Sequence, residues 1–162
     1  SLLMGRHKVI PLKQELQLLN DYLSLEQTRF EERLQVSYDI DENTKDYKVP
    51  PMLLQTLVEN GIKHGISRLA KGGTITIRAK QKGDNLKVSI ENTGNFREET
   101  DREPGFGLLN SRQRLFLLYG EKGELTIKNS EVGTVIAVVT IPDKIKEIKV
   151  LKSNIDDKNE EL

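Results

Sequence analysis

Six polar side chains share one face of a predicted helix in the middle of the chain. We expect that helix to begin at Pro50-Pro51, because proline suits a first turn, and to end near His64 with Gly65 as its C-cap. Its apolar arc holds Leu54, Leu57, Val58 and Ile62. Its polar arc holds Gln55, Thr56, Glu59, Asn60, Lys63 and His64. This row of an amide, a carboxylate, an ammonium and an imidazole could bind a phosphate group or a metal ion. An ordinary solvated helix face shows the same pattern.

Two residues of this helix favour the functional interpretation. Asn60 and Gly61 are poor helix formers, and each costs about 0.5–1 kcal/mol relative to alanine in a helix interior. A helix that serves only stability has little reason to carry both.

A second candidate site lies where a predicted strand runs into a loop. Leu86, Val88 and Ile90 alternate on one face, and Asn92 continues their phase just before Gly94. A buried amide needs a hydrogen-bond partner, and an amine of a ligand could be that partner. The alternative is an ordinary turn built from asparagine and glycine.

A third candidate is the glycine pair Gly105 and Gly107, which precedes a helix predicted over 108–119. Glycines at a helix N-terminus leave backbone N–H groups accessible, and the helix dipole adds positive potential, so phosphate is the natural ligand. Three side chains further along could reach the same anion: Asn110, Arg112 and Arg114. The alternative for the glycine pair is a flexible hinge.

The elements that must position these groups follow from hydrophobic periodicity. Helical spacing of Leu12, Leu16, Leu19, Leu23 and Phe30 predicts a helix over 12–33. Alternation predicts strands over 34–40, from Gly72-Gly73 to a turn at Gly83-Asp84, over 86–90, over 124–128 and over 134–141. Polar loops are predicted over 41–48 and 94–106.

These elements predict an α+β fold, a two-layer α/β sandwich. Adjacent strands joined by hairpins imply a mixed sheet, and one apolar face per strand implies that helices cover one side. The strand over 134–141 is apolar on both faces, so we expect it to be central and covered.

Composition narrows the class of protein. The chain has 162 residues, a formal net charge of +0 and no cysteine. Thiolate chemistry is therefore excluded, and a partner that is a nucleic acid is not expected. No apolar run approaches the roughly 20 residues that span a bilayer. We expect one domain over 12–142, an upstream remnant over 1–11 and a charged tail over 143–162.

Three segments together resemble a known family. They are Leu12–Phe30, Pro50–Gly65 and Gly105–Gly120. The combination resembles the Bergerat ATP-binding fold that gyrase, the heat-shock ATP-dependent chaperones, histidine kinases and MutL share. More narrowly, it is similar to LytS-type sensor histidine kinases over nearly all of residues 8–142.

The resemblance implies a role for each candidate residue. Asn60 is similar to the residue that holds Mg²⁺ between the phosphates of ATP, with Lys63 and His64 facing phosphate or ribose. Catalytic roles fall to Glu59, Asn60 and Lys63. The other nucleotide-binding residues implied are Asn92, Gly94, Gly105, Gly107, Leu108, Asn110 and Arg114. The loop over 95–104 resembles the lid that orders over bound ATP.

The chain departs from the family pattern at two places. The usual adenine motif is Asp-x-Gly-x-Gly, whereas here Asn92 takes the place of the aspartate and Phe96 that of the second glycine. An amide oxygen still accepts a hydrogen bond, but a weaker one than a carboxylate accepts. Relatives that hydrolyse ATP carry a glutamate where this chain has Thr56, so fast hydrolysis is not expected.

The implied function is the catalytic domain of a two-component sensor histidine kinase. The γ-phosphate would pass to a histidine on an upstream dimerising segment; His7 lacks the expected sequence context for that role. A response regulator, a homodimer of the full-length protein and a cytoplasmic position in a membrane-anchored bacterial sensor are also implied. Two alternatives stay open: a nucleotide-binding or interaction module that has lost phosphotransfer, and an ATPase of the gyrase or MutL class.

Overall fold

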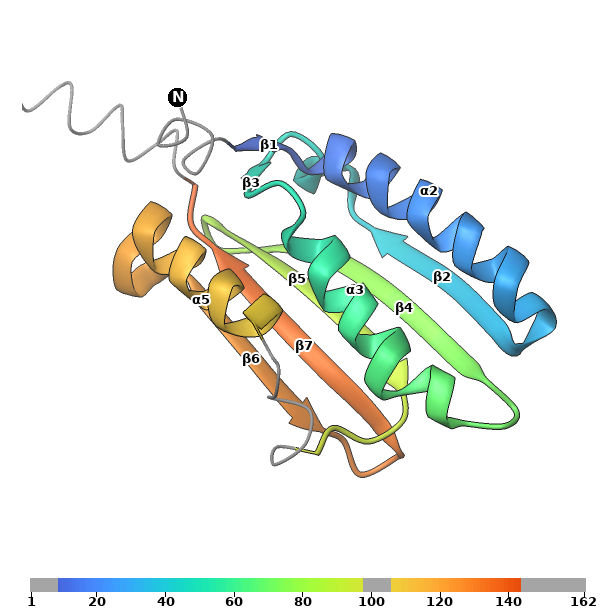
Figure 1. Cartoon of the computed structure of the whole chain (residues 1–162). Coiled ribbons are helices and arrows are strands. Elements are labelled where there is room, and N and C mark those ends of the chain that lie inside the picture. Colours follow the sequence, from blue (N-terminus) through green and yellow to red (C-terminus); the bar gives the residue numbers. More distant parts are fainter. Residues whose placement is uncertain (1–8, 98–105, 144–162) are drawn as a thin grey trace, which may run out of the picture.

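A computed structural model describes residues 9–97 and 106–143 of the chain (Figure 1). Its helices are α2 (Leu12–Phe30), α3 (Leu53–His64) and α5 (Phe106–Tyr119). Its strands are β1 (Ile10–Pro11), β2 (Leu34–Ile40), β3 (Lys48–Val49), β4 (Gly73–Lys82), β5 (Asn85–Thr93), β6 (Glu124–Asn129) and β7 (Thr134–Ile141). None of the helices within these ranges is long and apolar enough to cross a membrane. The predicted tail beyond Asp143, the lid residues 98–104, Gly105 and His7 lie outside the described residues.

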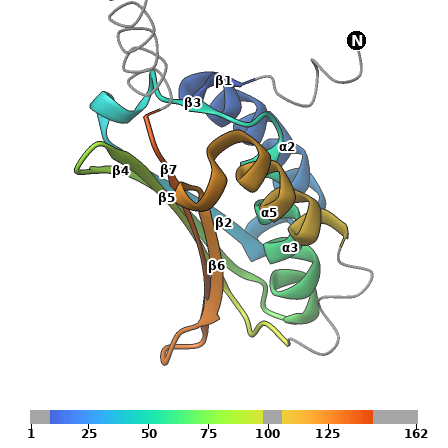
Figure 2. The same ribbon diagram turned by 90° about the vertical axis from the view of Figure 1, so that its left-hand side faces the viewer.

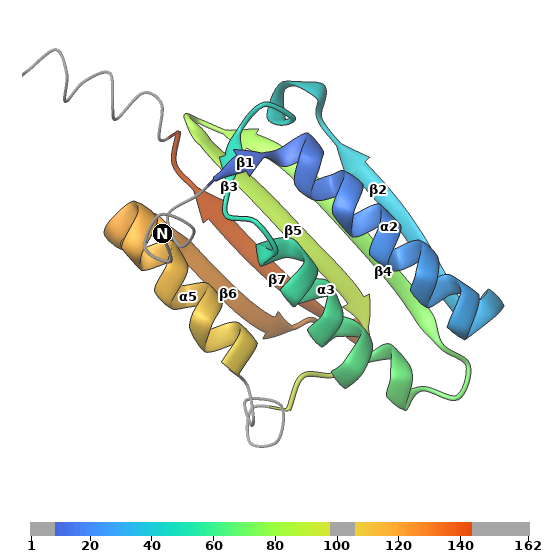
Figure 3. The same ribbon diagram turned by 45° about the horizontal axis from the view of Figure 1, so that its top comes forward.

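The main sheet is mixed, as predicted. Its strand order is β2-β4-β5-β7-β6, in which β2 runs parallel to β4 and every other neighbouring pair is antiparallel. The small strands β1 and β3 pair with each other beside it, with Ile10 opposite Val49. Figures 2 and 3 show α2, α3 and α5 side by side on one face of the sheet. The predicted two-layer α+β sandwich is therefore confirmed.

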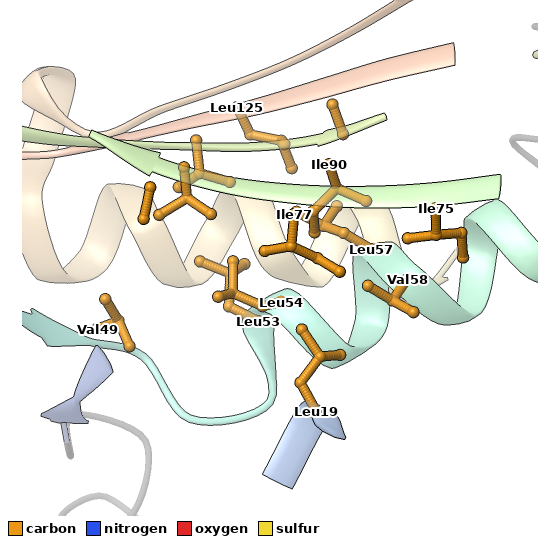
Figure 4. Close-up of a cluster of buried hydrophobic side chains, with 14 of the residues drawn as sticks. Leu19, Val49, Leu53, Leu54, Leu57, Val58, Ile75, Ile77, Ile90 and Leu125 are labelled. Carbon is orange, nitrogen blue, oxygen red and sulfur yellow. The ribbon is translucent and has the colours of Figure 1, made fainter. Parts of the chain in front are cut away.

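The core lies between α3 and the middle strands. Ile77 of β4 and Ile90 of β5 point at Leu54 and Leu57 of α3 in a buried cluster, with at most 4% of any of these side chains exposed (Figure 4). Burying a side chain of this size contributes about 1.5–3 kcal/mol. This contact fixes α3 as the central helix of the layer.

Three helix boundaries differ from the predictions. The central helix begins at Leu53 rather than at Pro50, because a proline pushes the residue before it out of helical geometry, and Met52 then turns the chain with φ of 68°. The first helix ends at Phe30, and residues Glu31–Arg33 form a separate 3₁₀ turn after Glu31 adopts φ of 56°. The third helix starts at Phe106, slightly earlier than predicted.

The prediction that the last strand is covered on both faces is wrong. β7 is internal in the sheet, between β5 and β6, as expected. However, Ile136 and Val138 are half-exposed, whereas Val135, Ala137 and Val139 are buried. The reason is that all the described helices lie on the other face, so apolar residues on this side have nothing to cover them.

The contrast between the two faces gives a matched pair of test substitutions. Val88 on β5 faces the helices with 1% exposure, whereas Val138 on the adjacent strand faces outward. We expect Val88→Ala to lower the free energy of unfolding by about 2 kcal/mol, through lost burial and a cavity. Val138→Ala should lower it by less than about 1 kcal/mol. Equal losses in chemical denaturation would contradict the one-sided packing.

Candidate nucleotide-binding site

A small cavity lies between α3, α5 and the helix-facing side of the sheet. Its volume is about 30 Å³. Its walls combine an apolar floor with amide and imidazole side chains, and they are Leu57, Asn60, Gly61, His64, Gly65, Asn92, Asn95, Phe96, Leu108, Ile127, Val135 and Ala137. Four of the residues singled out in the sequence, Asn60, His64, Asn92 and Leu108, therefore come together here.

Asn92 is the buried polar group of the cavity. It is 4% exposed, and its Nδ2 donates a hydrogen bond to the carbonyl oxygen of Thr93 at 3.1 Å. The sequence predicted this burial, because Asn92 continues the phase of the apolar face of β5. That partner is a neighbouring backbone group, and this bond sets the orientation of the amide.

Two glycines of α3 make room for that amide. A Cβ at Gly61 would lie 2.7 Å from Asn92 Oδ1, and a Cβ at Gly65 would collide with Asn92 Nδ2 and lie 2.8 Å from the carbonyl oxygen of Thr93. Gly61 and Gly65 are about one helical turn apart, so both face β5. The poor helix former that the sequence marked at 61 thus has a packing reason, and Gly65 has the same reason in addition to its role as C-cap.

The chain leaves β5 through a strained turn. Gly94 has φ of 132°, and a Cβ there would lie 2.8 Å from the Cα of Gly65. Phe96 is then held by Asn129 of β6, whose Oδ1 accepts from the Phe96 N–H at 2.7 Å and whose Nδ2 donates to the Phe96 carbonyl oxygen at 3.0 Å. Phe96, in the place of the second family glycine, therefore forms a fixed wall of the cavity.

The start of α5 lies against the polar face of α3. A Cβ at Gly107 would lie 2.9 Å from Thr56 Cγ2 and 3.8 Å from Asn60 Nδ2. Glycine at 107 therefore permits close approach of the α5 N-terminus to Asn60. Thr56 itself donates a hydrogen bond to the carbonyl oxygen of Met52 at 2.8 Å, so this position holds no carboxylate and its hydroxyl is engaged within the helix.

Three further predicted site residues, Glu59, Lys63 and Asn110, lie around the cavity rather than in its wall. Glu59 and Lys63 are exposed on α3, and Glu59 accepts a hydrogen bond from Gln55 Nε2 at 3.1 Å. Asn110 is exposed on α5. His64 lines the cavity, and its Nδ1 lies 3.3 Å from Arg68 Nη2.

Arg114 lies about two helical turns beyond Gly107, toward the opposite end of α3. Its positive charge acts on Glu15 and on Tyr119. Burial raises the pKa of the Tyr119 phenol to about 12, and the charge of Arg114 opposes that rise. The structure thus gives Arg114 electrostatic partners away from the cavity, and its contact with nucleotide remains a prediction.

Sequence reasoning missed several wall residues. Leu57, Ile127, Val135 and Ala137 look like ordinary core residues in the sequence, and only their convergence makes a cavity. The spacing Gly61-x-x-x-Gly65 was the available signal for close approach to a strand.

Comparison with known proteins places the chain in a family. Residues 48–145 match the family described as histidine kinase-, DNA gyrase B-, and HSP90-like ATPase. The match covers more than half of the chain, so the chain belongs to this family.

Relatives and solved structures agree with that placement. Sensor histidine kinase YpdA of Escherichia coli (strain K12) is 40% identical over 137 residues, which are 79% of this chain and 24% of that protein. Sensor protein LytS of Staphylococcus haemolyticus (strain JCSC1435) is 34% identical over 155 residues, 88% of this chain and 26% of that protein. The resemblance to LytS-type sensors is thereby confirmed, and the chain spans about a quarter of the length of these relatives.

The fold has solved counterparts as well. The catalytic domain of histidine kinase ThkA superposes with a TM-score of 0.65 at 20% identity, covering 84% of this chain and 95% of that chain. At this identity the likeness establishes the fold alone.

The packing of Asn92 against α3 predicts that Gly61→Ala has opposite effects on the free energy of unfolding with and without the Asn92 side chain. Gly61→Ala should destabilise the protein by about 1–2 kcal/mol, because the new Cβ meets the Asn92 amide. In an Asn92→Ala background the same change should stabilise it by about 0.5–1 kcal/mol, because alanine favours a helix over glycine. Denaturant unfolding of the four proteins measures this coupling. A cost of Gly61→Ala that is the same in both backgrounds would contradict the contact.

Proposed function

We propose that this chain binds ATP with Mg²⁺ in the cavity and acts as the catalytic domain of a sensor histidine kinase. The observation that carries the proposal is the buried Asn92 amide beside Gly61 and Gly65, with Asn60 and the start of α5 at the same cavity. A mostly apolar cavity with a few amide and imidazole side chains in its wall, next to a helix N-terminus, has the parts that a nucleotide needs.

The amide of Asn92 supports adenine as the base. Because Nδ2 already donates to the Thr93 carbonyl oxygen, the acceptor Oδ1 is what this side chain offers a ligand. An acceptor pairs with the exocyclic amine of adenine and repels the carbonyl of guanine.

The donor set around Asn60 fits magnesium. An amide oxygen is a hard ligand, and Mg²⁺ commonly takes one or two protein ligands together with phosphate oxygens and water. Asn60 lies at the cavity beside Gly107, where the phosphates of a base-bound nucleotide would emerge. Bound magnesium would neutralise phosphate charge.

The chain's own groups would position the phosphates. N–H groups at the start of α5 donate to phosphate oxygens, while Lys63 and His64 bring positive or donor groups from α3. Glu59, exposed on the same face, can accept a hydrogen bond from a reacting group. Catalysis of this kind is mostly orientation and electrostatics: the bond to the leaving oxygen of ADP breaks as a phosphorus–nitrogen bond forms on a histidine of an upstream segment.

The names of the relatives support the wider setting. YpdA and LytS are sensor proteins about four times longer than the matched part, and histidine kinase ThkA has also been solved in complex with the response regulator protein TrrA. By analogy we assign this chain a response-regulator partner. Its place would be the cytoplasmic side of a membrane-anchored, homodimeric sensor.

The two alternatives make different demands on the site. An ATPase of the gyrase or MutL class needs a base near the γ-phosphate, and the engaged hydroxyl of Thr56 does not supply one. A module that has lost phosphotransfer would follow from the changes at Asn92 and Phe96. Absence of binding at millimolar ATP would favour that module.

Asn60→Ala tests the metal assignment. We expect the variant to lose Mg²⁺-dependent binding of a non-hydrolysable ATP analogue in titration calorimetry, because the amide oxygen that completes the magnesium site is gone. Circular dichroism and the unfolding transition should stay unchanged. Asn85→Ala, an exposed asparagine at the start of β5, is the control. Unchanged magnesium dependence in Asn60→Ala would rule out the assignment.

Base selectivity tests the role of Asn92. The wild-type chain should bind the ATP analogue at least about tenfold more tightly than the GTP analogue, since one correct hydrogen bond is replaced by a repulsive contact. Asn92→Ala should remove most of that preference. Equal affinities for the two nucleotides in the wild-type chain would show that Asn92 does not read the base.

A further inference from the structure

Glu15 of α2 is a buried carboxylate that lies outside the cavity wall. It is 1% exposed. Its Oε2 accepts the N–H of Met52 at 3.0 Å, and its Oε1 accepts the N–H of Leu54 at 3.2 Å.

These contacts complete the N-terminus of α3. A helix leaves its first four N–H groups without partners in the helix itself. No side chain at the N-cap supplies them here, because the N-cap is Met52. The N–H of Leu53 lies 3.4 Å from the Pro50 carbonyl oxygen, and the first internal bond joins Thr56 N–H to the Met52 carbonyl oxygen. Glu15 therefore caps α3 from a helix 37 residues earlier in the chain.

The surroundings of Glu15 have opposite effects on the pKa of its carboxyl group. Burial raises the pKa of the Glu15 carboxyl, while the backbone N–H groups and the positive charge of Arg114 on α5 act to lower it. The first turn of α3 carries no acidic residue, and its dipole places positive potential at the carboxylate. Protonation would turn one acceptor oxygen into a donor, so the complete cap exists only in the ionised form.

α3 is thus held by one buried polar side chain at each end. Glu15 of α2 fixes its first turn, and Asn92 of β5 sits between Gly61 and Gly65 near its last turn. Asn60 lies between these two attachments. Because the helix is short and stiff, a shift at the first turn moves Asn60 relative to α5 and β5.

We propose that Glu15 is a positioning residue for the nucleotide site: by capping α3 it sets where Asn60 and Gly61 stand against Asn92 and the start of α5. This inference rests on the proposed function for its effect on ATP. It also predicts a change in the ligand-free site.

The test compares Glu15→Gln with the control Asp21→Asn. Glutamine keeps the shape but offers one acceptor oxygen, and its NH₂ would face a backbone N–H. Asp21→Asn also removes one acidic charge from α2, at an exposed position whose partner is Gln17 of the same helix. Both are studied well below their unfolding temperatures, so that the whole population is folded.

In Glu15→Gln we expect the side-chain amide signals of Asn60 and Asn92 to shift in NMR spectra without nucleotide. Affinity for the Mg²⁺-ATP analogue should fall about tenfold, the scale of a lost hydrogen bond to a charged group. Asp21→Asn should change neither. A lower unfolding temperature for Glu15→Gln with unmoved Asn60 and Asn92 signals and unchanged affinity would overturn the proposal, since the cap would then be purely structural.

A pH series on the wild-type chain tests whether Glu15 positions Asn60, even where Glu15→Gln fails to fold. Because the complete cap needs the ionised carboxylate, it is lost as the pH falls through the pKa of Glu15, which burial raises above its usual value. The backbone amide signals of Met52 and Leu54 and the side-chain signal of Asn60 should then titrate together with the Glu15 carboxyl carbon. Independent titration of Asn60 would refute the link.

If the wild-type chain binds no ATP analogue, the proposed function fails, whereas the ligand-free signals still decide the role of Glu15.

Discussion

The fold depends on one close contact between a helix and a strand, the seating of the Asn92 amide against Gly61 and Gly65. Helix-on-sheet interfaces are normally filled by apolar side chains, and a buried amide there requires a fixed hydrogen bond and a place to lie. The Thr93 carbonyl oxygen supplies the bond, and the two glycines supply the place. The Asn92 amide fills the space that a Cβ at either glycine would take, and it thereby lines the cavity between α3 and the sheet.

The one-sided sheet decides where such a cavity can form. Helices lie on one face, so an enclosed site can form only between the two layers or at their edge. The open face is kept hydrated by charged pairs, among them Arg78 Nη1 with Glu91 Oε1 at 2.9 Å. A hydrogen bond from Thr134 and the nearby Arg78 hold the pKa of Glu91 below its usual value, so this pair persists at neutral pH.

The orientation of α3 and α5 arranges charge along the site. α3 begins at the Glu15 carboxylate and ends with Lys63 and His64, which matches its dipole at both ends. The N-terminus of α5 meets the middle of α3 at Gly107, while Tyr119 at its other end donates a hydrogen bond to the Lys48 carbonyl oxygen at 3.3 Å. The N-terminus of α5, with its positive potential, therefore lies beside Asn60, and this potential would favour a bound anion there.

The main helices and strands and the mixed sheet could be predicted from the sequence. Period-2 and helical spacing located the strands and helices, since one apolar face per element is a local property. The buried amide at Asn92, the glycine at 61 and the glycine at 107 in the first turn of α5 pointed to candidate site residues, because each breaks a local preference. The family resemblance then implied a nucleotide as the ligand, which is proposed above.

Features that are set by contacts between residues far apart in the sequence could be seen only in the folded structure. One face of β7 is partly exposed because the described helices all pack on the other face of the sheet. The start of α3 at Leu53 depends on a proline pair and on a carboxylate of another helix. The roles of Glu15 and Asn129 could not be predicted from the sequence. Each side chain is hydrogen-bonded to the backbone of a distant segment, and such a contact leaves no spacing pattern in the sequence. The partner of the Asn92 amide was likewise invisible, since burial predicts that a hydrogen bond exists but not which group accepts it.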